Sequence, residues 1–509
     1  MKNNPKKRES NWMWDRCLKN PPIFPWSYHR VIVCSLALFS VVNVVYWVSF
    51  LNSSNSSDQK YSAVNTFPGS VSLGYFSPKV PAPVLPRSPQ KVAVKTSLRH
   101  IVFGIASSSR LWNHRKEYLK LWWRPNQMRG AVWLDKPIAN GSDDDLLPSI
   151  KISSNTFQFN YEYPGGRRSA LRISRIVSET LRLGFEDVRW LVMGDDDTFF
   201  VPDNLLSVLS KYDHTQYYYI GSSSESHTQN INFSYLMAYG GGGFAISYPL
   251  SKALAKMQDR CIQRHSALYG SDDRIQACMS ELGVPLTKEP GFHQFDVYGN
   301  IFGLLTAHPI APLVSLHHLD IVEPIFPQLD RIRALKLLTK PMNLDPAGLM
   351  QQTVCYDESR NWTVSVSWGY AVQIIGSIVS VQEMEIPTRT FLHWYRKNDK
   401  YGYSFNTRPV SRHVCEKPAV YYISNVFFRT KTNKTASKYV GSQFPNPHCK
   451  RDIQGPSRIK RVKVYKRLDP HVWERARRRN CCRVLPTEKQ DTIAVDVGAC
   501  KEDEIIELR

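Results

Sequence analysis

Apolar and polar residues follow different patterns in successive parts of this chain. Residues 31–51 form an apolar run without a charged side chain, and residues 52–98 are polar and rich in Ser, Asn and Pro. From residue 99, short apolar runs alternate with segments of helical periodicity. After about residue 330, the apolar residues alternate or run together as they do in β-strands. We therefore expect an anchor, a linker, an α/β domain and a β-rich region.

The segment 99–330 shows the alternation of strands and helices that is typical of an α/β sheet. The runs "HIVFGIAS", "AVWLD" and "VRWLVMG" suit buried strands, because parallel strands covered on both faces are almost wholly apolar. Between them, "WNHRKEYLKLWW" and "GGRRSALRISRIVSETLRLG" have helical periodicity, and Pro202 stands where a helix can begin. Ligands of open α/β sheets bind at the carboxyl ends of strands. Asp135 and Asp195–Asp197 lie at two such ends.

The segment 331–509 is expected to be β-rich and to contain disulfides. "NWTVSVSWGYAVQII" and "PAVYYISNVFFRT" resemble strands, and six of the eight cysteines that follow residue 51 lie in this segment. No CxxC pairs are present, which argues against a zinc site. The sequence assigns no role to this region.

The apolar run 31–51 is long enough to cross a bilayer. As a helix its 21 residues would extend about 31 Å. The preceding residues 1–30 contain seven Lys and Arg against two acidic residues, so the positive-inside rule leaves them in the cytosol. We therefore expect a cytosolic tail (1–30), one transmembrane anchor (31–51) and a lumenal stem (52–98). Six glycosylation sequons and an even number of cysteines after the anchor agree with a secretory lumen.

The net charge of +22 indicates an anionic partner or surface. A lumenal location makes nucleic acid an improbable partner, so no nucleic-acid binding is expected. The basic run 458–479, "RIKRVKVYKRLDPHVWERARRR", is interpreted as a solvated face or as a surface for an acidic ligand.

Three consecutive carboxylates, Asp195–Asp197, follow an apolar strand in "VMGDDDTFF". A helix cap would explain one of them. A calcium-binding EF-hand loop would need Gly at Phe200 and Glu at Leu206. The remaining interpretation is a hard divalent cation, held by carboxylates together with phosphates of a substrate. Because alternate residues of an extended segment face the same way, Asp195 and Asp197 are expected to face one ion, and Asp196 to face elsewhere.

Four segments in order resemble the Fringe-type β-1,3-glycosyltransferases: "MGDDDTFFVPDNLL", "YGGGGFAIS", "SDDRIQACMSELGV" and "VSLHHLD". The chain is most similar to the plant Fringe-related branch of type II membrane proteins, and the resemblance to the catalytic domain covers roughly residues 99–325. It implies a GT-A fold, a UDP-sugar donor and Mn²⁺, or Mg²⁺, at the aspartates.

The resemblance also implies roles for individual residues. Asp197 would be the principal metal ligand, with Asp195 binding directly or through water. Either His317 or His318 would complete the metal site. Asp273 matches the family's general base and Asp272 is the alternative, although both could simply interact with the dipole of the helix that they begin.

The donor side and the acceptor side of the site are implied less directly. His293 in "GFHQFD" resembles an acceptor-side segment. The residues expected on the donor side are Asp135, Arg115, Asp196, Gly241, Gly242 and Gly243, together with Gly240 of the same glycine run.

These expectations combine into one function. The chain would be an inverting, metal-dependent glycosyltransferase of the Golgi membrane, with its catalytic domain in the lumen. It would transfer a sugar from a UDP-sugar to a hydroxyl of a glycan or glycoprotein, with a β-1,3 linkage. The alternative is a non-catalytic carbohydrate-binding or scaffolding protein on the same fold. The sequence selects neither donor nor acceptor.

Overall fold

The computed structural model describes residues 39–41, 43, 95–138, 144–396, 400–442 and 455–505. The chain divides into two units, Met1–Pro89 and Gln90–Arg509. Nearly all of the expected tail, anchor and stem lies outside the described residues. Within the described part, no helix is both long enough and apolar enough to cross a bilayer.

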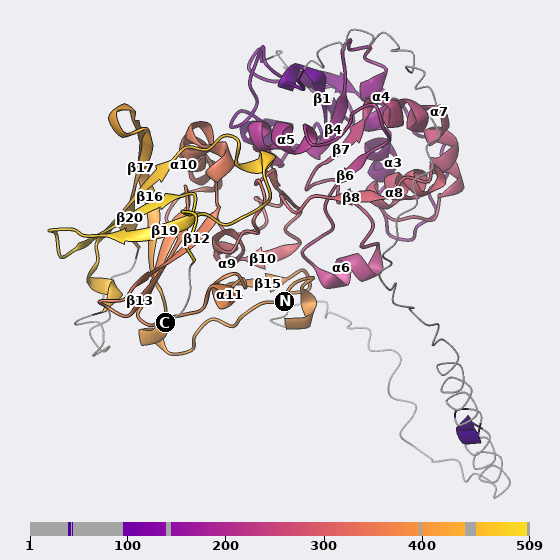
Figure 1. Ribbon diagram of the computed structural model, residues 1–509. Coiled ribbons are helices and arrows are strands. Elements are labelled where there is room, and N and C mark those ends of the chain that lie inside the picture. Colours follow the sequence, from indigo (N-terminus) through magenta and orange to yellow (C-terminus); the bar gives the residue numbers. More distant parts are fainter. Residues whose placement is uncertain are drawn as a thin grey trace, which may run out of the picture. The chain divides into compact units, whose positions relative to one another are not determined.

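A seven-stranded mixed sheet forms the first half of the second unit (Figure 1). The adjacent strands β3, β2, β1 and β4 pair in parallel in this order. Strand β7 runs antiparallel to both β4 and β6. The three apolar runs expected to be strands form β1, β2 and β4, so the predicted mixed α/β architecture is confirmed. In spatial order the strands are β3 (Ser149–Ile152), β2 (Arg129–Leu134), β1 (Ile101–Ala106), β4 (Trp190–Asp195), β7 (Phe244–Ser247), β6 (Tyr219–Gly221) and β8 (Leu286–Lys288).

Helices cover both faces of this sheet. Along β4, Leu191 and Met193 pack in one apolar cluster with α4 (Ile176–Leu181) and α7 (Tyr248–Arg264). Trp190 and Val192 face the opposite side, in the core that contains residues of α2 and α5. This alternation explains why residues 190–193 of β4 are all apolar. The other helices of this half are α2 (Trp112–Leu119), α3 (Ser169–Ser174), α5 (Pro202–Leu209), α6 (His227–Asn232), α8 (Asp272–Glu281) and α9 (Phe302–Thr306).

Two small sheets connect distant parts of the chain. In one, β11 (Ser315–Leu316) lies between β5 (Phe199–Phe200) and β9 (Phe292–His293). In the other, β10 (Val297–Gly299) pairs with β15 (Phe391–His393). The first sheet matters most for the site, because it pairs the residues just after the aspartate triplet with those just before the two histidines.

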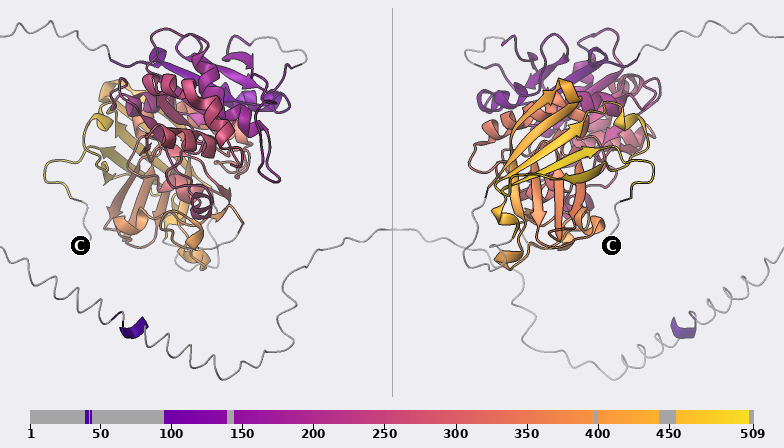
Figure 2. Two further views of the ribbon diagram at one scale, coloured as in Figure 1. Left: turned by 90° about the vertical axis from the view of Figure 1, so that its right-hand side faces the viewer. Right: turned by 60° about the vertical axis from the view of Figure 1, so that its left-hand side comes forward.

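The second half begins with α10 (Arg331–Leu344) and continues into an eight-stranded sheet (Figure 2). The helix was not expected. Asp330 caps it by accepting from the N–H of Arg333, and Leu335, Leu338 and Met342 lie on its buried side. The strands, in spatial order, are β12 (Gln352–Asp357), β13 (Trp362–Ser367), β14 (Ala371–Ile375), β16 (Ala419–Arg429), β17 (Lys434–Gly441), β18 (Arg461–Arg467), β20 (Thr492–Gly498) and β19 (Cys481–Leu485), with the short helix α11 (Val381–Met384) after β14.

Disulfides and one apolar core hold the second unit together. Cys261–Cys278 joins α7 to α8, and Cys481–Cys500 ties β19 to the segment after β20. Cys355–Cys482 joins β12 to β19, the first and last strands of the eight-stranded sheet. A single apolar cluster contains residues of β1, α5, α10 and the eight-stranded sheet. The two sheets therefore share a core.

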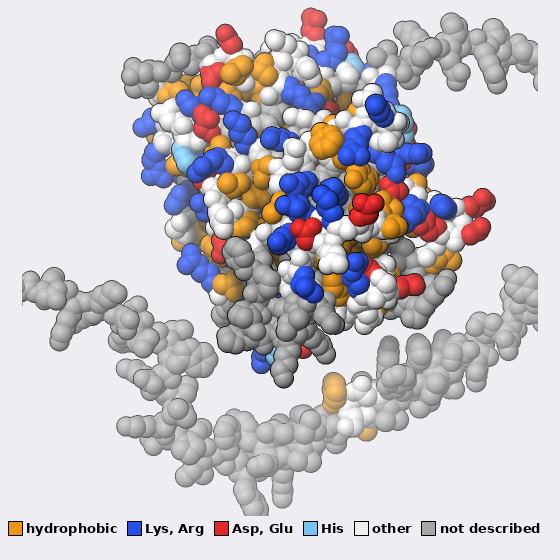
Figure 3. Space-filling model, turned by 90° about the vertical axis from the view of Figure 1, so that its left-hand side faces the viewer, with side chains coloured by type: hydrophobic (Ala, Val, Ile, Leu, Met, Phe, Trp, Pro, Cys, Tyr) orange, Lys and Arg blue, Asp and Glu red, His pale blue; other side chains and the backbone are white. Residues whose placement is uncertain are grey.

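The basic run expected to be a solvated face lies largely on the outside of the eight-stranded sheet. Along β18, Arg461, Lys463 and Arg467 are exposed, whereas Val462 and Val464 between them are buried. Lys438 on β17 stands opposite Lys463. Lys and Arg side chains are prominent over this side of the molecule (Figure 3). The alternation is what a strand with one solvated face requires.

Candidate active site

The carboxyl ends of three parallel strands meet at one edge of the seven-stranded sheet. Ala106, the last residue of β1, pairs with Asp195 on one side and with Trp133 on the other. Asp135 follows β2 directly, so Asp135 lies at the same edge of the sheet as the triplet. The sequence placed both acidic positions at strand ends, and the register brings those ends together.

The triplet forms a tight turn that is tied to the glycine run. The N–H of Thr198 donates to the Asp195 carbonyl, and the N–H of Asp195 donates to Thr198 Oγ1. The Thr198 hydroxyl in turn donates to the carbonyl of Gly241, at 2.7 Å. Thr198 was not among the expected site residues. A Thr three positions after a strand-end Asp is a local signal of such a turn.

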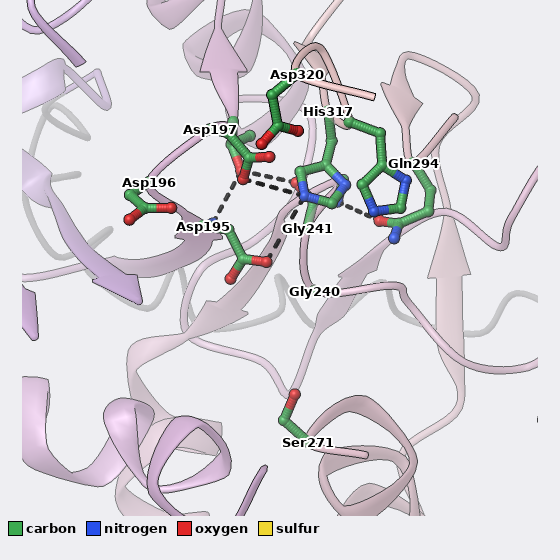
Figure 4. A network of polar contacts seen from close by, with 12 residues as sticks. Asp195, Asp196, Asp197, Gly240, Gly241, Ser271, Gln294, His317 and Asp320 are labelled. Carbon is green, nitrogen blue, oxygen red and sulfur yellow. Dashed lines mark hydrogen bonds and ion pairs between the residues drawn. The ribbon is translucent and has the colours of Figure 1, made fainter. Parts of the chain in front are cut away.

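Asp195, Asp197 and His317 form a compact cluster at this edge (Figure 4). His317 Nε2 lies 3.3 Å from Asp197 Oδ1 and 3.6 Å from Asp195 Oδ2. Asp197 and His317 are almost completely buried, whereas the Asp195 side chain is 36% exposed. The cluster is therefore open on the side of Asp195, where a ligand could approach.

The donor atoms of this cluster fit a divalent cation. One atom from each of the three side chains lies within 4.8 Å of the other two, close enough to surround one ion. Two carboxylates and one imidazole are ligands that Mn²⁺ accepts, and an oxygen-rich set also suits Mg²⁺. His317 Nδ1 is buried without a hydrogen-bond partner in the described part of the chain, so the ring faces the carboxylates with its other nitrogen.

His318 lies outside the cluster. Its backbone is left-handed, with φ of 54°, and its ring stacks on Trp394 with centroids 5.0 Å apart. Its Nδ1 lies 3.3 Å from Asp296 Oδ1 and 3.3 Å from the Phe295 carbonyl. Of the two histidines that the sequence left open, the structure brings only His317 to the carboxylates.

In this cluster, burial and the neighbouring charges have opposite effects on the pKa values. Burial raises the pKa of Asp195 to about 7, although His317 opposes this rise. Burial disfavours the charged form of His317, but Asp197 and Asp195 outweigh it and raise the pKa of His317 to about 9. Burial also opposes ionisation of Asp197, but His317 and Arg115 prevail and the pKa of Asp197 is lowered. The cluster therefore retains a proton where a metal ion could provide the positive charge.

Asp196 points away from the cluster, as the alternation predicted (Figure 4). It accepts hydrogen bonds from the Ser107 hydroxyl at 2.6 Å and from Arg115 at 2.8 Å. Arg115 also contacts Asp197 at 3.3 Å and Asp320 at 2.5 Å. Arg115 and Asp196, both expected on the donor side, thus bind each other. Asp320 was missed, although it follows the two histidines in the sequence.

The glycine run packs between the cluster and the start of α8. A Cβ on Gly241 would lie 2.0 Å from His317 Cε1, and one on Gly240 would lie 2.5 Å from Asp272 Oδ1. Gly243 has φ of +84° and Gly242 donates its N–H to Gln294. These glycines allow His317 and Asp272 to approach the same stretch of backbone.

Asp272 and Asp273, at the start of α8, have different surroundings. Asp272 accepts hydrogen bonds from the Gly240 N–H at 2.9 Å and from the Ser271 hydroxyl. Both oxygens of Asp273 accept backbone N–H groups of its own loop, from Tyr269, Gly270 and Arg274. Burial raises the pKa of Asp272 to about 6, although the Gly240 N–H opposes the shift, and burial also raises the pKa of Asp273. Only Asp272 contacts the glycine run.

Two further expected residues lie near the site without joining it. Asp135 is exposed and accepts the N–H of Ser109 at 2.7 Å. His293 Nδ1 lies 3.0 Å from Glu225 Oε1. Arg172, which was not expected, is buried and donates to the carbonyls of Trp133 and Ser107 at the ends of β2 and β1. No sequence signal identifies Arg172, because it is one of several arginines in a helical stretch.

Comparisons with known proteins show partial similarities. The family described as "Protein of unknown function, DUF604" matches residues 229–482. A mouse β-1,3-glucosyltransferase is 32% identical over 120 residues, which is 23% of this chain and 23% of that protein. Its human counterpart is 31% identical over the same share. The chain thus spans about a quarter of the length of these relatives. It is similar to β-1,3-glycosyltransferases over that stretch, and the more specific resemblance to the Fringe type stays a prediction.

A solved structure also matches part of the chain. It is the mannosyltransferase PcManGT from Pyrobaculum calidifontis in complex with GDP-Man and Mn²⁺. The match has 10% identity, covers 49% of this chain and 76% of that one, and has a TM-score of 0.21. A TM-score this low does not establish a shared fold.

Proposed function

We propose that this protein is a metal-dependent, inverting glycosyltransferase with a GT-A-like catalytic domain over residues 99–330. It transfers a sugar from a UDP-sugar to a hydroxyl of a glycan or glycoprotein, with a β-1,3 linkage. The observation that carries this proposal is the cluster of Asp195, Asp197 and His317 at the carboxyl end of the sheet. The partial similarity to β-1,3-glucosyltransferases supports it.

Asp195, Asp197 and His317 would hold Mn²⁺ or Mg²⁺. A divalent ion in this position supplies positive charge for the diphosphate that leaves with the nucleotide. The exposed side of Asp195 is where the diphosphate would bind, because Asp197 and His317 are closed to solvent. Arg115 contacts Asp197 directly and favours its ionised form. Asp196 and Asp320 in turn hold Arg115 in place.

We assign the general base to Asp272 in preference to Asp273. An inverting transfer needs a carboxylate that accepts the proton of the attacking hydroxyl. Asp273 is occupied by three backbone N–H groups of its own loop, which indicates a role in holding the start of α8. Asp272 has a pKa of about 6 and adjoins the glycine run on which His317 packs. A base with this pKa is ionised at neutral pH and still binds a proton readily.

The proposal places the enzyme in the Golgi membrane as a single-pass type II protein. Residues 1–30 would face the cytosol, 31–51 would span the membrane and 52–98 would form the stem. The apolar run and the basic residues before it support this orientation. Residues 331–509 would then lie in the lumen with the catalytic domain, in a compartment that permits the disulfides.

A donor-hydrolysis screen tests the proposal. The purified lumenal part, residues 90–509, would be incubated with a panel of UDP-sugars and Mn²⁺, and UDP release would be measured. We expect release with at least one donor, and its loss on chelation. If the protein neither binds nor cleaves any UDP-sugar, the non-catalytic carbohydrate-binding alternative replaces the proposal.

Matched substitutions at the start of α8 test the assignment of the base. With a transferable donor and an acceptor, Asp272→Asn should lower kcat by at least about a hundredfold while UDP binding persists. Asp273→Asn should act chiefly on stability, because it replaces one of the two oxygens that accept backbone N–H groups with an NH2 donor. If Asp273→Asn abolishes turnover in a stably folded protein and Asp272→Asn does not, the assignment is reversed.

A further inference from the structure

A separate cavity of about 590 Å³ lies where the two halves of the second unit meet. Its walls include Ser222–Glu225, from the segment after β6, and Phe292, His293 and Phe295 around β9. Other lining residues come from beyond residue 380, among them Pro387 and Phe405. Its volume is in the range of pockets that bind small molecules, roughly 300–1,000 Å³. None of Asp195, Asp197, His317 and Asp272 lines it.

Two histidines of the cavity wall each leave one ring nitrogen without a partner. His308 is 5% exposed, and its Nδ1 lies 2.8 Å from the Pro309 carbonyl. Since a carbonyl can only accept, Nδ1 carries the proton, and Nε2 is an acceptor. His293 Nδ1 is held by Glu225 in the same manner. The Nε2 atoms of both rings are buried and have no hydrogen-bond partner in the described residues.

Hydroxyl groups and aromatic rings complete this wall. Ser222 and Ser223 line the cavity, and within the described residues neither hydroxyl group forms a hydrogen bond. Phe292 and Phe295 are buried and Phe405 is half-buried. Unpaired polar groups among aromatic rings suit a ligand that has both hydroxyl groups and apolar C–H surface. A purely apolar ligand would leave these polar atoms desolvated, which costs free energy.

The charges at the cavity are largely neutralised. Glu225 accepts from His293 and from the N–H of Phe295, and Arg479 pairs with Glu385. Lys288 is exposed and lies over the ring of Tyr235 at 5.7 Å, so it belongs to the rim. An anionic ligand would meet two carboxylates, and a phosphate group would find only one uncommitted cation. The balance therefore favours an uncharged ligand.

One segment separates the cavity from the proposed metal cluster. His293 and Phe295 line the cavity, and their rings stack with centroids 5.0 Å apart. Gln294, between them, accepts the N–H of Gly242 in the glycine run. Asp296 approaches His318, the neighbour of His317, at 3.3 Å. Residues 292–296 thus lie between the cavity and the glycine run on which His317 packs.

From this arrangement we infer that the cavity is a binding site for an uncharged oligosaccharide, and that it holds the part of the acceptor glycan remote from the reacting hydroxyl. The role as acceptor subsite rests on the proposed function, whereas saccharide binding itself does not. The site also gives residues 331–509 a role, because Phe405, Pro387 and Arg479 of that region close the cavity.

Saccharide binding to the metal-free protein tests this inference. Residues 90–509 with chelator would be titrated with neutral di- and trisaccharides, namely laminaribiose, cellobiose, lactose and laminaritriose, with a uronic-acid disaccharide for comparison. Isothermal titration and saturation-transfer NMR would report binding. We expect saturable binding of at least one neutral sugar and weaker binding of the acidic one. No binding of any neutral sugar would overturn the inference.

Variants locate the bound sugar. Phe405→Ala and the milder pair Ser222→Ala with Ser223→Ala should each raise the Kd at least tenfold. Phe427→Ala removes an exposed ring from the outer face of β16 and should leave the Kd unchanged. Asp197→Ala, which removes the proposed metal ligand, should also leave it unchanged. Loss of binding in Asp197→Ala, or unchanged binding in both cavity variants, would overturn the assignment. If donor hydrolysis fails in wild type while sugar binding follows this pattern, the catalytic proposal and the acceptor role are both wrong, and the cavity remains a saccharide-binding site.

Discussion

Two sites of the folded unit, one in each half, differ in how their charged side chains are balanced. In the half built on the eight-stranded sheet, Lys466 pairs with Asp345, and both side chains are 3% exposed. Asp345 also accepts the N–H of Gly348, so each charge is compensated. At the edge of the seven-stranded sheet, the carboxylates of Asp195–Asp197 outnumber the cationic groups that contact them, Arg115 and His317. A balanced buried pair is typical of a structural role, whereas an excess of carboxylates at a partly exposed cluster is typical of a ligand-binding site.

The excess of negative charge should be essential for activity. Asp197→Ala removes the carboxylate closest to His317 and should lower UDP release by about a hundredfold to a thousandfold, the range for loss of one group that stabilises developing charge. Initial rates with the best UDP-sugar would measure the loss. Circular dichroism should show a folded protein. Full activity in this variant would show that the excess of carboxylates at Asp195–Asp197 is not needed for the reaction.

The balanced pair should be essential for stability. Asp345→Ala leaves the Lys466 ammonium buried without its partner, and we expect a loss of about 3–5 kcal/mol in the free energy of unfolding. Urea denaturation would measure it. The double variant Asp345→Leu with Lys466→Met should recover most of the loss, because it removes both charges. If the double variant is as unstable as the single one, the pair has a role beyond mutual compensation.

The disulfides offer a second contrast between the halves. Cys261–Cys278 closes a loop of 17 residues, and Cys355–Cys482 closes one of 127. In the chain-entropy account, the longer loop contributes about 2 kcal/mol more stability than the shorter one. Two double variants test this ordering by thermal unfolding. One carries Cys261→Ser and Cys278→Ser, and the other carries Cys355→Ser and Cys482→Ser. Equal losses would show that local packing decides the contribution.

The smallest expected effect concerns the pH dependence of metal binding. His317, with its pKa raised to about 9 by Asp197 and Asp195 against the effect of burial, must lose its proton before Nε2 can bind a metal ion. From about pH 8 to about pH 9, Asp195 is ionised and His317 is still largely protonated, so Mn²⁺ affinity should rise by up to about tenfold. Calorimetric titrations across this interval measure the slope. His317→Gln should flatten it, and an unchanged slope in that variant would assign the proton to another group.

Hydrophobic patterning predicted the parts of the fold that are locally encoded. The apolar runs of β1, β2 and β4 and the helix that begins at Asp272 lie where they were expected. The sheet of β5, β11 and β9 could not be predicted, because its strands have two residues each and β5 pairs with β11 across more than a hundred positions. Such pairing depends on the tertiary fold and leaves no periodicity in the sequence.

The same distinction applies to the site. The triplet and the two histidines were recognisable from their order along the chain, but only the three-dimensional arrangement separates His317 from His318 and Asp272 from Asp273. In each pair the neighbours have the same chemistry, and the choice depends on which backbone groups occupy their polar atoms. The contact between Arg115 and Asp320 spans 205 positions and has no local signal.

The link between β12 and β19 has a consequence for the behaviour of the protein at high concentration. These two strands end the hydrogen-bonded ladder of the large sheet, and such end strands ordinarily expose unpaired N–H and C=O groups to strands of other molecules. Cys355 and Cys482 hold the two ends against each other. A covalent closure of this kind leaves little room for a foreign strand to add to the sheet, so it opposes polymerisation through these two end strands.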